Sequence, residues 1–283
     1  MRRTFLEILE ENNFDYNVEY KRLKKLFYGN EAYSSYLDIW ISLCQEIQQN
    51  FLKVNFRKNA LSLEDFDEIN GFSFKSCENA PNLEYLISFC EYIVNFISAI
   101  SFDINTFSDL LTLIHTQIDT IMDTICYMPV KEKGITIFVP KEPAVIGVAQ
   151  VVDKDISYKV LCYNHYSLKG DIEEKRKILE KFALKLEPRQ REIQELNPTL
   201  KNDVFYAFNN LNIRHNNLDK SDIGNFNEKF SKFTNNETEK LYDYVYNYCL
   251  EAFLELENKE GHKIIKNLKH KWTYFYNILC NFS

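Results

Sequence analysis

The chain has 283 residues, 45% of them hydrophobic, and a formal net charge of −7. With only 7 Gly and 6 Pro it has too few turn formers for an all-β fold, and it contains no Gly-rich phosphate-binding loop. The negative charge argues against nucleic-acid binding over the whole surface, so any such binding requires a local basic patch.

The cysteines and the start of the chain predict a cytoplasmic protein without a membrane segment. The 7 cysteines are scattered singly, without a C-x-x-C pair, which favours free thiols in a reducing compartment. The N-terminus carries acidic residues where a secretory signal requires an apolar run. No segment reaches about 18 uncharged apolar residues, the length of a membrane span. No cluster of His, Cys or carboxylate residues has metal-ligand spacing, so neither a metal nor another cofactor is expected.

The sequence pattern predicts a helical N-terminal region over residues 1–130. Apolar residues recur at helical spacing over 83–102, where polar residues such as Glu91 interrupt an otherwise wide stripe. A break at 103–105 precedes a second apolar helix over 107–125. Two long apolar helices joined by a tight break predict a helical hairpin.

A small antiparallel β meander is predicted for residues 131–168, with its strands between about 134 and 164. The segments that carry this prediction are rich in β-branched and aromatic residues and cover 134–139, 145–152 and 156–163. The expected fold class is therefore mainly α, a helical bundle with this small inserted meander.

A helical C-terminal region is predicted for residues 169–283. This region either forms its own domain or completes one bundle with residues 1–130. Asp171 is expected to begin a helix that ends near Leu186. The sequence Thr234-Asn-Asn-Glu237 is a capping box and predicts the start of another long helix.

The last predicted helix runs from His262 to about Asn281 and is amphipathic. One of its faces is basic and carries Lys263, Lys266 and Lys269. A basic face on an acidic protein can contact RNA phosphates. The alternative is an ordinary solvated helix face.

The segment 203–217 ends in side chains that can bind a ligand or move a proton. At about 100° per residue, His215 continues a helical apolar face, and Arg214 lies one turn beyond Asn210. One interpretation is structural. His215 then fills a core, Arg214 complements the helix C-terminus, and Asn216 or its neighbour caps the helix in a left-handed conformation.

A catalytic interpretation starts from the same pair of residues. The imidazole of His215 can move the proton of a 2′-hydroxyl or of a leaving oxygen near neutral pH. The guanidinium of Arg214 can hold a phosphate and stabilise its developing charge. Together they form a minimal set for metal-independent RNA cleavage by internal transfer.

The sequence Asn209-Asn-Leu-Asn-Ile-Arg-His-Asn-Asn217 resembles the signature helix end of the HEPN superfamily. Members of that family are all-α bundles that usually dimerise, and many are metal-independent ribonucleases of toxin and antiphage systems. The resemblance implies that His215 is the catalytic histidine and Asn216 its polar neighbour. The family places its arginine upstream of the histidine. This chain has Asn210 there, which leaves Arg214 as the phosphate contact and Asn210 as a positioning residue.

We therefore expect a HEPN-like protein that cleaves or binds RNA as a homodimer. Its expected setting is a bacterial toxin or defence system, with an antitoxin or defence partner protein. The alternative is a non-catalytic helical scaffold or interaction module, in which the same residues cap a helix and fill a core.

Overall fold

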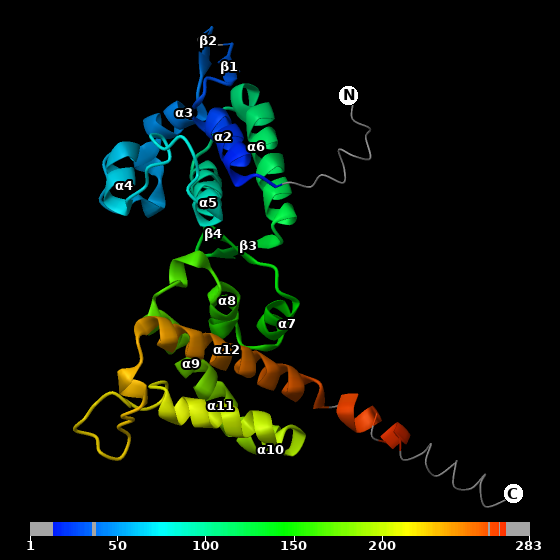
Figure 1. The fold of residues 1–283 in the computed structure, drawn as a ribbon. Helices are drawn as coiled ribbons and strands as arrows, with labels where there is room; N and C mark the ends of the chain where they lie inside the picture. The colour runs from blue at the N-terminus through cyan, green and yellow to red at the C-terminus, as the bar shows by residue number, and fades with distance from the viewer. Residues whose placement is uncertain (1–13, 36–37, 260, 266, 270–283) are drawn as a thin grey trace, which may run out of the picture. The chain divides into compact units, whose positions relative to one another are not determined.

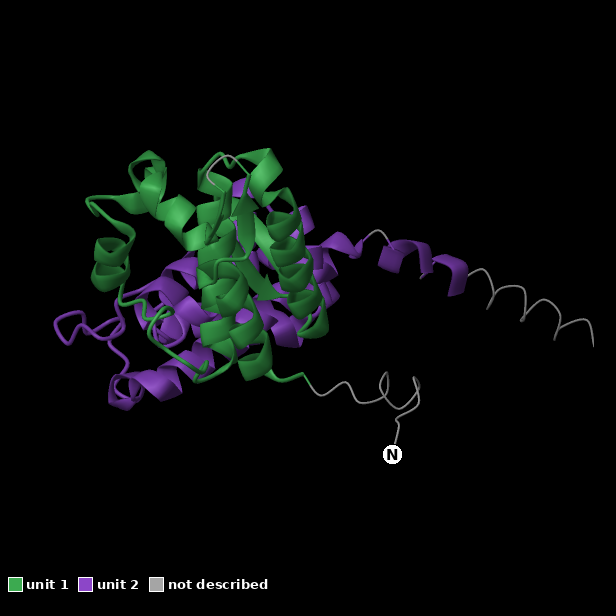
Figure 2. Ribbon diagram, turned by 90° about the horizontal axis from the view of Figure 1, so that it is seen from above, with its two compact units in different colours: residues 1–140 green, residues 141–283 purple. Residues whose placement is uncertain are grey.

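The computed structural model describes residues 14–35, 38–259, 261–265 and 267–269. It is 66% helical, and the strands of the described chain form two antiparallel two-stranded sheets. The predicted mainly α fold with a small β element is thus confirmed. The chain divides into two compact units, residues 1–140 and 141–283 (Figure 2). The division follows residue 140, whereas the sequence suggested boundaries at 130 and 168.

The first unit combines short and long helices with two β hairpins. Its elements are α2 (Tyr16–Tyr28), β1 (Ala32–Ser34), β2 (Ile39–Ile41), α3 (Leu43–Gln49), the 3-10 turns η1 (Phe51–Lys53) and η2 (Asn55–Arg57), α4 (Leu63–Asn70), α5 (Leu83–Ala99), α6 (Ile104–Thr124), β3 (Tyr127–Glu132) and β4 (Ile135–Pro140) (Figure 1). Helices α5 and α6 confirm the two long helices predicted for this region.

Aromatic side chains on α5 form the centre of the first unit. Phe89 is completely buried, with ring centroids 5.1 Å from Tyr20 and 4.9 Å from Phe74. Tyr92 and Phe96 extend the cluster along the same helix, with ring centroids 4.7 Å apart. These large buried rings follow the apolar stripe that the sequence showed.

Hairpin β3–β4 is anchored by the two polar residues that interrupt the α5 stripe. Its turn residues, Lys133 and Gly134, both have positive φ, at 52° and 85°, as a two-residue hairpin turn with type I′ twist requires. The Glu91 carboxylate accepts a 2.7 Å hydrogen bond from the backbone N–H of Phe138. Asn95 bonds to both the N–H and the carbonyl of Thr136, at 2.8 and 2.7 Å. Polar side chains within the apolar stripe of α5 therefore satisfy backbone groups of β4 that do not pair with β3.

The predicted strands at 145–152 and 156–163 are wrong, because both segments are helices. Helix α7 covers Pro143–Val151, and α8 covers Lys154–Cys162. Pro143 occupies the first turn of α7, where its fixed φ favours a helix and its missing N–H costs nothing. Buried residues follow helical spacing, as with Val145 and Val148 on α7. Short runs of β-branched residues that are buried in this way have the composition of a strand but not its alternation.

The secondary-structure elements in the described part of the second unit are all helical. Its elements after α7 and α8 are the 3-10 turn η3 (Tyr166–Leu168), α9 (Ile172–Leu186), η4 (Glu187–Arg189), α10 (Gln190–Leu196), α11 (Pro198–Asn210), η5 (Phe230–Lys232) and α12 (Asn235–Glu257). Asp171 caps α9, and the Thr234–Glu237 capping box begins α12, as the sequence predicted.

Helices α9 and α12 pack together through rings and a buried cation. The rings of Phe182 and Tyr246 have centroids 5.8 Å apart. The ammonium of Lys175 is 2.8 Å from carboxylates of both Glu239 and Asp243, and Lys175 is only 6% exposed. This pairing fixes α12, and α12 in turn supports the end of α11.

Candidate functional site

The predicted site residues lie at and beyond the end of helix α11. Asn197 caps the start of this helix by accepting a 3.1 Å bond from the N–H of Leu200. The helix ends at Asn210, and Asn212 has a φ of 58°, in the left-handed region. The helical path that was expected to carry His215 on the apolar face is therefore wrong. Asn212, and neither of the asparagines at 216 and 217, takes the left-handed position after the helix.

The last four carbonyl groups of α11 all accept hydrogen bonds, although a helix leaves these groups without donors of its own. The N–H of Leu211 reaches the carbonyl of Ala207 at 3.0 Å, and the N–H of Arg214 reaches that of Phe208 at 3.0 Å. Amide side chains bond to the last two carbonyls, those of Asn209 and Asn210. We call residues 211–229, which provide most of these groups, the amide loop.

Asn217 is the centre of the amide loop. It is 2% exposed, and its side chain makes hydrogen bonds in three directions. Its Nδ2 donates to the carbonyl of Asn209 at 2.9 Å and to that of Asn225 at 2.6 Å. Its Oδ1 accepts from the N–H of Asn212 at 2.7 Å. One buried amide therefore joins the helix end to both halves of the loop.

Two further side chains complete this arrangement. Asn227 donates to the carbonyl of Asn210 at 3.1 Å, and its Oδ1 accepts from the N–H of Lys229 at 3.1 Å. The hydroxyl of Tyr242, on α12, donates to the carbonyl of Leu211 at 3.0 Å. Burial raises the pKa of Tyr242 to about 12, so this donor keeps its proton at neutral pH.

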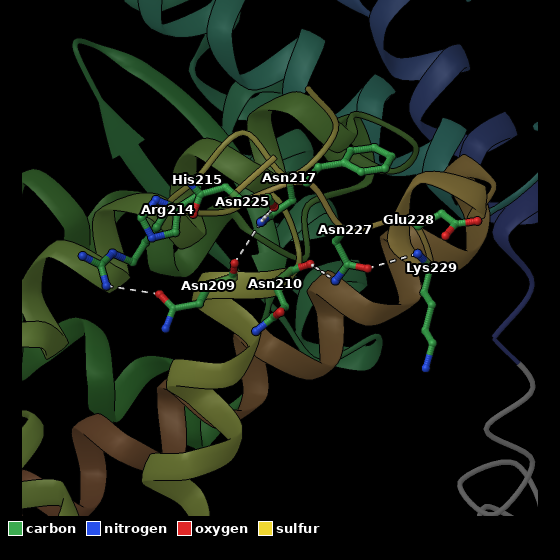
Figure 3. A pocket seen from close by; sticks show the side chains of 11 residues that line it. Asn209, Asn210, Arg214, His215, Asn217, Asn225, Asn227, Glu228 and Lys229 are labelled. Atoms are coloured by element: carbon green, nitrogen blue, oxygen red, sulfur yellow. Dashed lines mark hydrogen bonds between the residues drawn. The ribbon is translucent and has the colours of Figure 1, made fainter. Parts of the chain in front are cut away.

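Arg214 is held by two partners that the sequence did not indicate. Its Nε forms an ion pair with the Glu187 carboxylate. Its Nη1 donates to the side-chain oxygen of Asn209 at 3.2 Å (Figure 3). Glu187 lies in η4, 27 positions earlier in the chain (214 − 187 = 27), so no local pattern could have revealed the pair. The guanidinium remains partly exposed, with 36% of its side-chain surface accessible.

His215 is half-buried beside Arg214. None of the residues that the structure describes makes a hydrogen bond to its imidazole, and only its backbone carbonyl accepts one, from the N–H of Asn217. The interpretation of His215 as a fully buried core histidine is therefore excluded. Asn216, the predicted polar neighbour, is exposed and does not line the cavity described next.

His215 and Arg214 line an open polar cavity of about 800 Å³ (Figure 3). Its wall is formed by the end of α11 and the amide loop, through Asn209, Asn210, Arg214, His215, Asn217, Gly224, Asn225, Phe226, Asn227, Glu228 and Lys229. Three of the four residues predicted as catalytic, Asn210, Arg214 and His215, thus share one cavity. Lys229 adds an exposed cation that the sequence did not indicate, because it is 14 positions from His215 (229 − 215 = 14).

Two of the three predicted RNA-binding lysines can be placed. Lys263 and Lys269 are exposed on the described helical stretch, residues 261–265 and 267–269, and Lys266 lies outside the described residues. Neither of the two described lysines lines the cavity. Ile264, Ile265 and Leu268 on the same stretch are about half exposed, between 49% and 55%.

No group of three or more His, Cys, Asp or Glu residues in the described part of the chain has metal-binding geometry. Among the described helices, none combines the length and the apolar character that crossing a bilayer requires.

Comparison with known proteins places the chain in no group. No protein-family model, curated protein or solved structure matches it. The function must therefore be argued from the cavity itself.

Proposed function

We propose that the cavity at the end of α11 binds an RNA strand and that His215 moves a proton in its cleavage. The observation that carries this proposal is the shared cavity of His215, Arg214 and Lys229. An imidazole that makes no hydrogen bond with the described residues is available to a substrate. The cations of Arg214, its neighbour in the chain, and of Lys229, on another part of the cavity wall, can attract phosphates (Figure 3).

The proposed reaction is internal transfer. The 2′-oxygen of a ribose attacks the adjacent phosphorus, and the bond from phosphorus to the 5′-oxygen of the next nucleotide breaks. The products are a strand with a 2′,3′-cyclic phosphate and a strand with a free 5′-hydroxyl. The proton of the 2′-hydroxyl leaves as the new bond forms, and the 5′-oxygen gains one as its bond breaks. His215 serves as base or acid in one of these transfers.

Arg214 stabilises the charge that builds up on the phosphate oxygens. Its pair with Glu187 and its bond to Asn209 use Nε and Nη1 and orient the planar group. A guanidinium has five N–H groups, so donors remain for a phosphate. Glu187 also offsets part of the positive charge, which weakens phosphate binding compared with an unpaired arginine.

A second copy of the chain can supply the second proton-transfer group. One imidazole acts as either base or acid in a given step, whereas two copies of His215 can do both. We therefore propose a homodimer as the active form, in the toxin or defence setting that the HEPN resemblance implies, with cleavage restrained by a partner protein. The proposal places the protein in the cytoplasm.

The alternative is a non-catalytic scaffold, and one observation favours it. The hydrogen bonds at this site mainly hold the amide loop, and Arg214 already has an acidic partner. In that case the cavity is simply the surface left by a well-capped helix end. The two proposals differ in what His215 does, which an experiment can decide.

The test compares His215→Ala with His115→Ala on labelled RNA in the presence of EDTA. His115 is an exposed histidine on α6 in the first unit, so its removal controls for loss of any imidazole. We expect the unmodified protein and His115→Ala to yield cyclic-phosphate ends, and His215→Ala to lose at least about 100-fold in rate, the typical contribution of a general acid or base. If His215→Ala cleaves as fast as the unmodified protein, or if none of the proteins acts on a total RNA pool, the scaffold is the better account.

A further inference from the structure

Residues 261–283, which we call the basic segment, differ in charge from the rest of the chain. They contain four lysines and no aspartate or glutamate, whereas the whole chain has a formal net charge of −7. A stretch with charges of one sign is typical of a segment that contacts a surface of the opposite sign. The cavity at the end of α11 does not account for this charge, because no described residue of the basic segment lines it.

The described part of the basic segment leaves large apolar side chains in contact with water. Residues 261–265 and 267–269 are helical and follow α12 (Figure 1). Ile264, Ile265 and Leu268 are 55%, 53% and 49% exposed. At the turn of an α-helix these three side chains lie within one arc of about 100°. Lys263 and Lys269 lie outside this arc and are also exposed. The described turns are therefore amphipathic, and within the described part of the chain nothing buries their apolar face.

The sequence of residues 270–283, which lie outside the described part, continues the same pattern. In a helix of the same spacing, Trp272, Phe275 and Tyr276 would fall on the arc of Ile264 and Leu268. Tryptophan and tyrosine are enriched where a membrane meets water, because an apolar ring carries a polar N–H or O–H. A basic amphipathic helix with aromatic and aliphatic residues on its apolar side is typical of a segment that lies in the surface of a bilayer.

The two faces together decide between the possible partners of the basic segment. RNA pairs with lysines but leaves the aliphatic side chains of Ile264, Ile265 and Leu268 in water. A second copy of the segment brings lysines against lysines. A bilayer with anionic lipids suits both faces, since the apolar side chains enter the acyl boundary and the lysines reach the headgroups.

We propose that the basic segment binds the surface of a membrane that contains anionic lipids. This inference is independent of RNA cleavage at His215. The apolar side chains provide burial and the lysines provide attraction, and such a helix lies in the interface plane without crossing the bilayer. Anionic lipids give the cytoplasmic leaflet its negative surface potential, so the proposed membrane surface faces the compartment proposed above.

The test uses the full-length protein with the exposed Trp40 changed to Phe, so that Trp272 is the sole tryptophan. The vesicles consist of phosphatidylcholine alone or of phosphatidylcholine and phosphatidylserine in equal parts, each with plain or brominated acyl chains. We expect the emission of Trp272 to move to shorter wavelength with the anionic vesicles and to be quenched by their brominated form. Binding to phosphatidylcholine alone should be at least about tenfold weaker, and added salt should weaken binding to the anionic vesicles.

A matched pair of variants tests the apolar face. Leu268→Asp should weaken binding to the anionic vesicles at least about tenfold, because it replaces a side chain that enters the bilayer by a charged one. Leu184→Asp makes the same change at a position of α9 that is 64% exposed, so it should bind within about twofold of the unmodified protein. Both variants should retain the circular dichroism spectrum of the unmodified protein.

A second pair tests the basic face at constant net charge. Lys263→Glu combined with Lys269→Glu should weaken vesicle binding more than about tenfold, since each lysine near an anionic surface contributes about fivefold. Lys220→Glu combined with Lys240→Glu removes the same charge at exposed positions outside the segment and should have little effect.

Three results would overturn the proposal. One is equal vesicle binding by Leu268→Asp and Leu184→Asp. Another is short-wavelength emission of Trp272 before any vesicle is added, because the protein itself then covers the segment. The third is no response to vesicles together with weaker RNA binding by the Lys263 and Lys269 variant, which would assign the basic face to RNA. None of these results bears on cleavage by His215, which is measured without vesicles.

Discussion

The aromatic core of the first unit and the amide loop of the second are held together in opposite ways. Around Phe89, aromatic rings from α2, α5 and the segment before α5 pack together, with ring centroids about 5 Å apart. The stabilisation is therefore spread over many weak contacts. Around Asn217, single hydrogen bonds of 2.6–2.9 Å connect backbone groups that have no other partner among the residues that the structure describes. The ring contacts depend little on the orientation of the groups, whereas the hydrogen bonds of Asn217 require each donor to face its acceptor.

This difference indicates where a binding site can be built. The ring cluster buries its apolar surface, and the hydroxyls of Tyr20 and Tyr92 in it already donate to other groups of the unit. The amide loop satisfies its own backbone and still leaves His215, Arg214 and Asn210 on the wall of a cavity. A polar network fully satisfied in this way can hold exposed functional groups in place.

The largest stability effect is expected from Phe89→Ala, in the aromatic core. The substitution removes a completely buried ring and leaves a cavity, at a cost of about 3–5 kcal/mol in the free energy of unfolding. Urea unfolding followed by Trp40 fluorescence in a Trp272→Phe background reports on the first unit. Leu113→Ala, at a half-exposed position of α6, should cost far less. Equal losses would mean that the core is not where the stability lies.

The second-largest loss of stability is expected from Asn217→Ala, which removes the hydrogen bonds at the centre of the amide loop. It leaves the carbonyls of Asn209 and Asn225 and the N–H of Asn212 without their bonds, at a cost of about 2–3 kcal/mol. Thermal unfolding monitored by circular dichroism measures this cost. Asn216→Ala, at the exposed neighbouring position, should change stability by about 0.5 kcal/mol or less. A mild Asn217→Ala would show that water can replace the amide.

A smaller, pH-dependent effect is expected from Asp67→Asn in the first unit. Burial raises the pKa of the Asp67 carboxyl to about 6, although the hydroxyl of Tyr92 donates to it at 2.9 Å. Because the folded state holds this proton more tightly than the unfolded chain, its stabilising contribution is complete below the unfolded pKa and is lost as pH rises through about 6.

Asp67→Asn keeps an acceptor for Tyr92 and removes the charge. It should therefore match the unmodified protein near pH 4 and exceed it at pH 7.5 by about 1 kcal/mol, a value reduced from the full shift because Asp67 is only partly buried. Urea titrations at the two pH values measure the difference. Asp119→Asn, at an exposed position of α6, should show no such pH-dependent gain. A gain that is the same at both pH values would point to a cause other than titration.

The smallest stability effect is expected from Arg214→Ala. Its ion pair with Glu187 is partly exposed at both ends, so its loss should cost about 0–1 kcal/mol. In contrast to Phe89→Ala, this variant should stay folded and yet bind RNA several-fold more weakly in filter-binding assays, with a shallower dependence on salt. Unchanged RNA affinity would show that Glu187 already neutralises the arginine.

The sequence could predict the elements that depend on local signals better than those that depend on contacts between distant residues. Helices α5, α6 and α12 were predictable, because apolar periodicity and a capping box are local signals. Helices α7 and α8 were mistaken for strands, since β-branched composition over so few residues does not decide between the two.

At the candidate site, the sequence predicted the residue types but not their arrangement. Asn210, Arg214 and His215 do line one cavity, yet the helix stops before the last two. What stops it is the left-handed Asn212 together with bonds from Asn217 and Asn227, which reach back over 8 and 17 positions. Such contacts, like the pair of Arg214 with Glu187, depend on how the chain returns to itself and leave no periodic trace.

The measurement that tests the central claim most directly is histidine-selective NMR of the full-length protein, with an RNA oligonucleotide made uncleavable by a 2′-O-methyl group at each position. The claim is that the amide loop presents His215 to an RNA strand. We predict that the ring signals of His215 shift on titration while those of the exposed His115 do not, and that Asn217→Ala abolishes the response. If His215 stays unperturbed at saturating RNA, or if the signals of His262 alone respond, the cavity is not the RNA site.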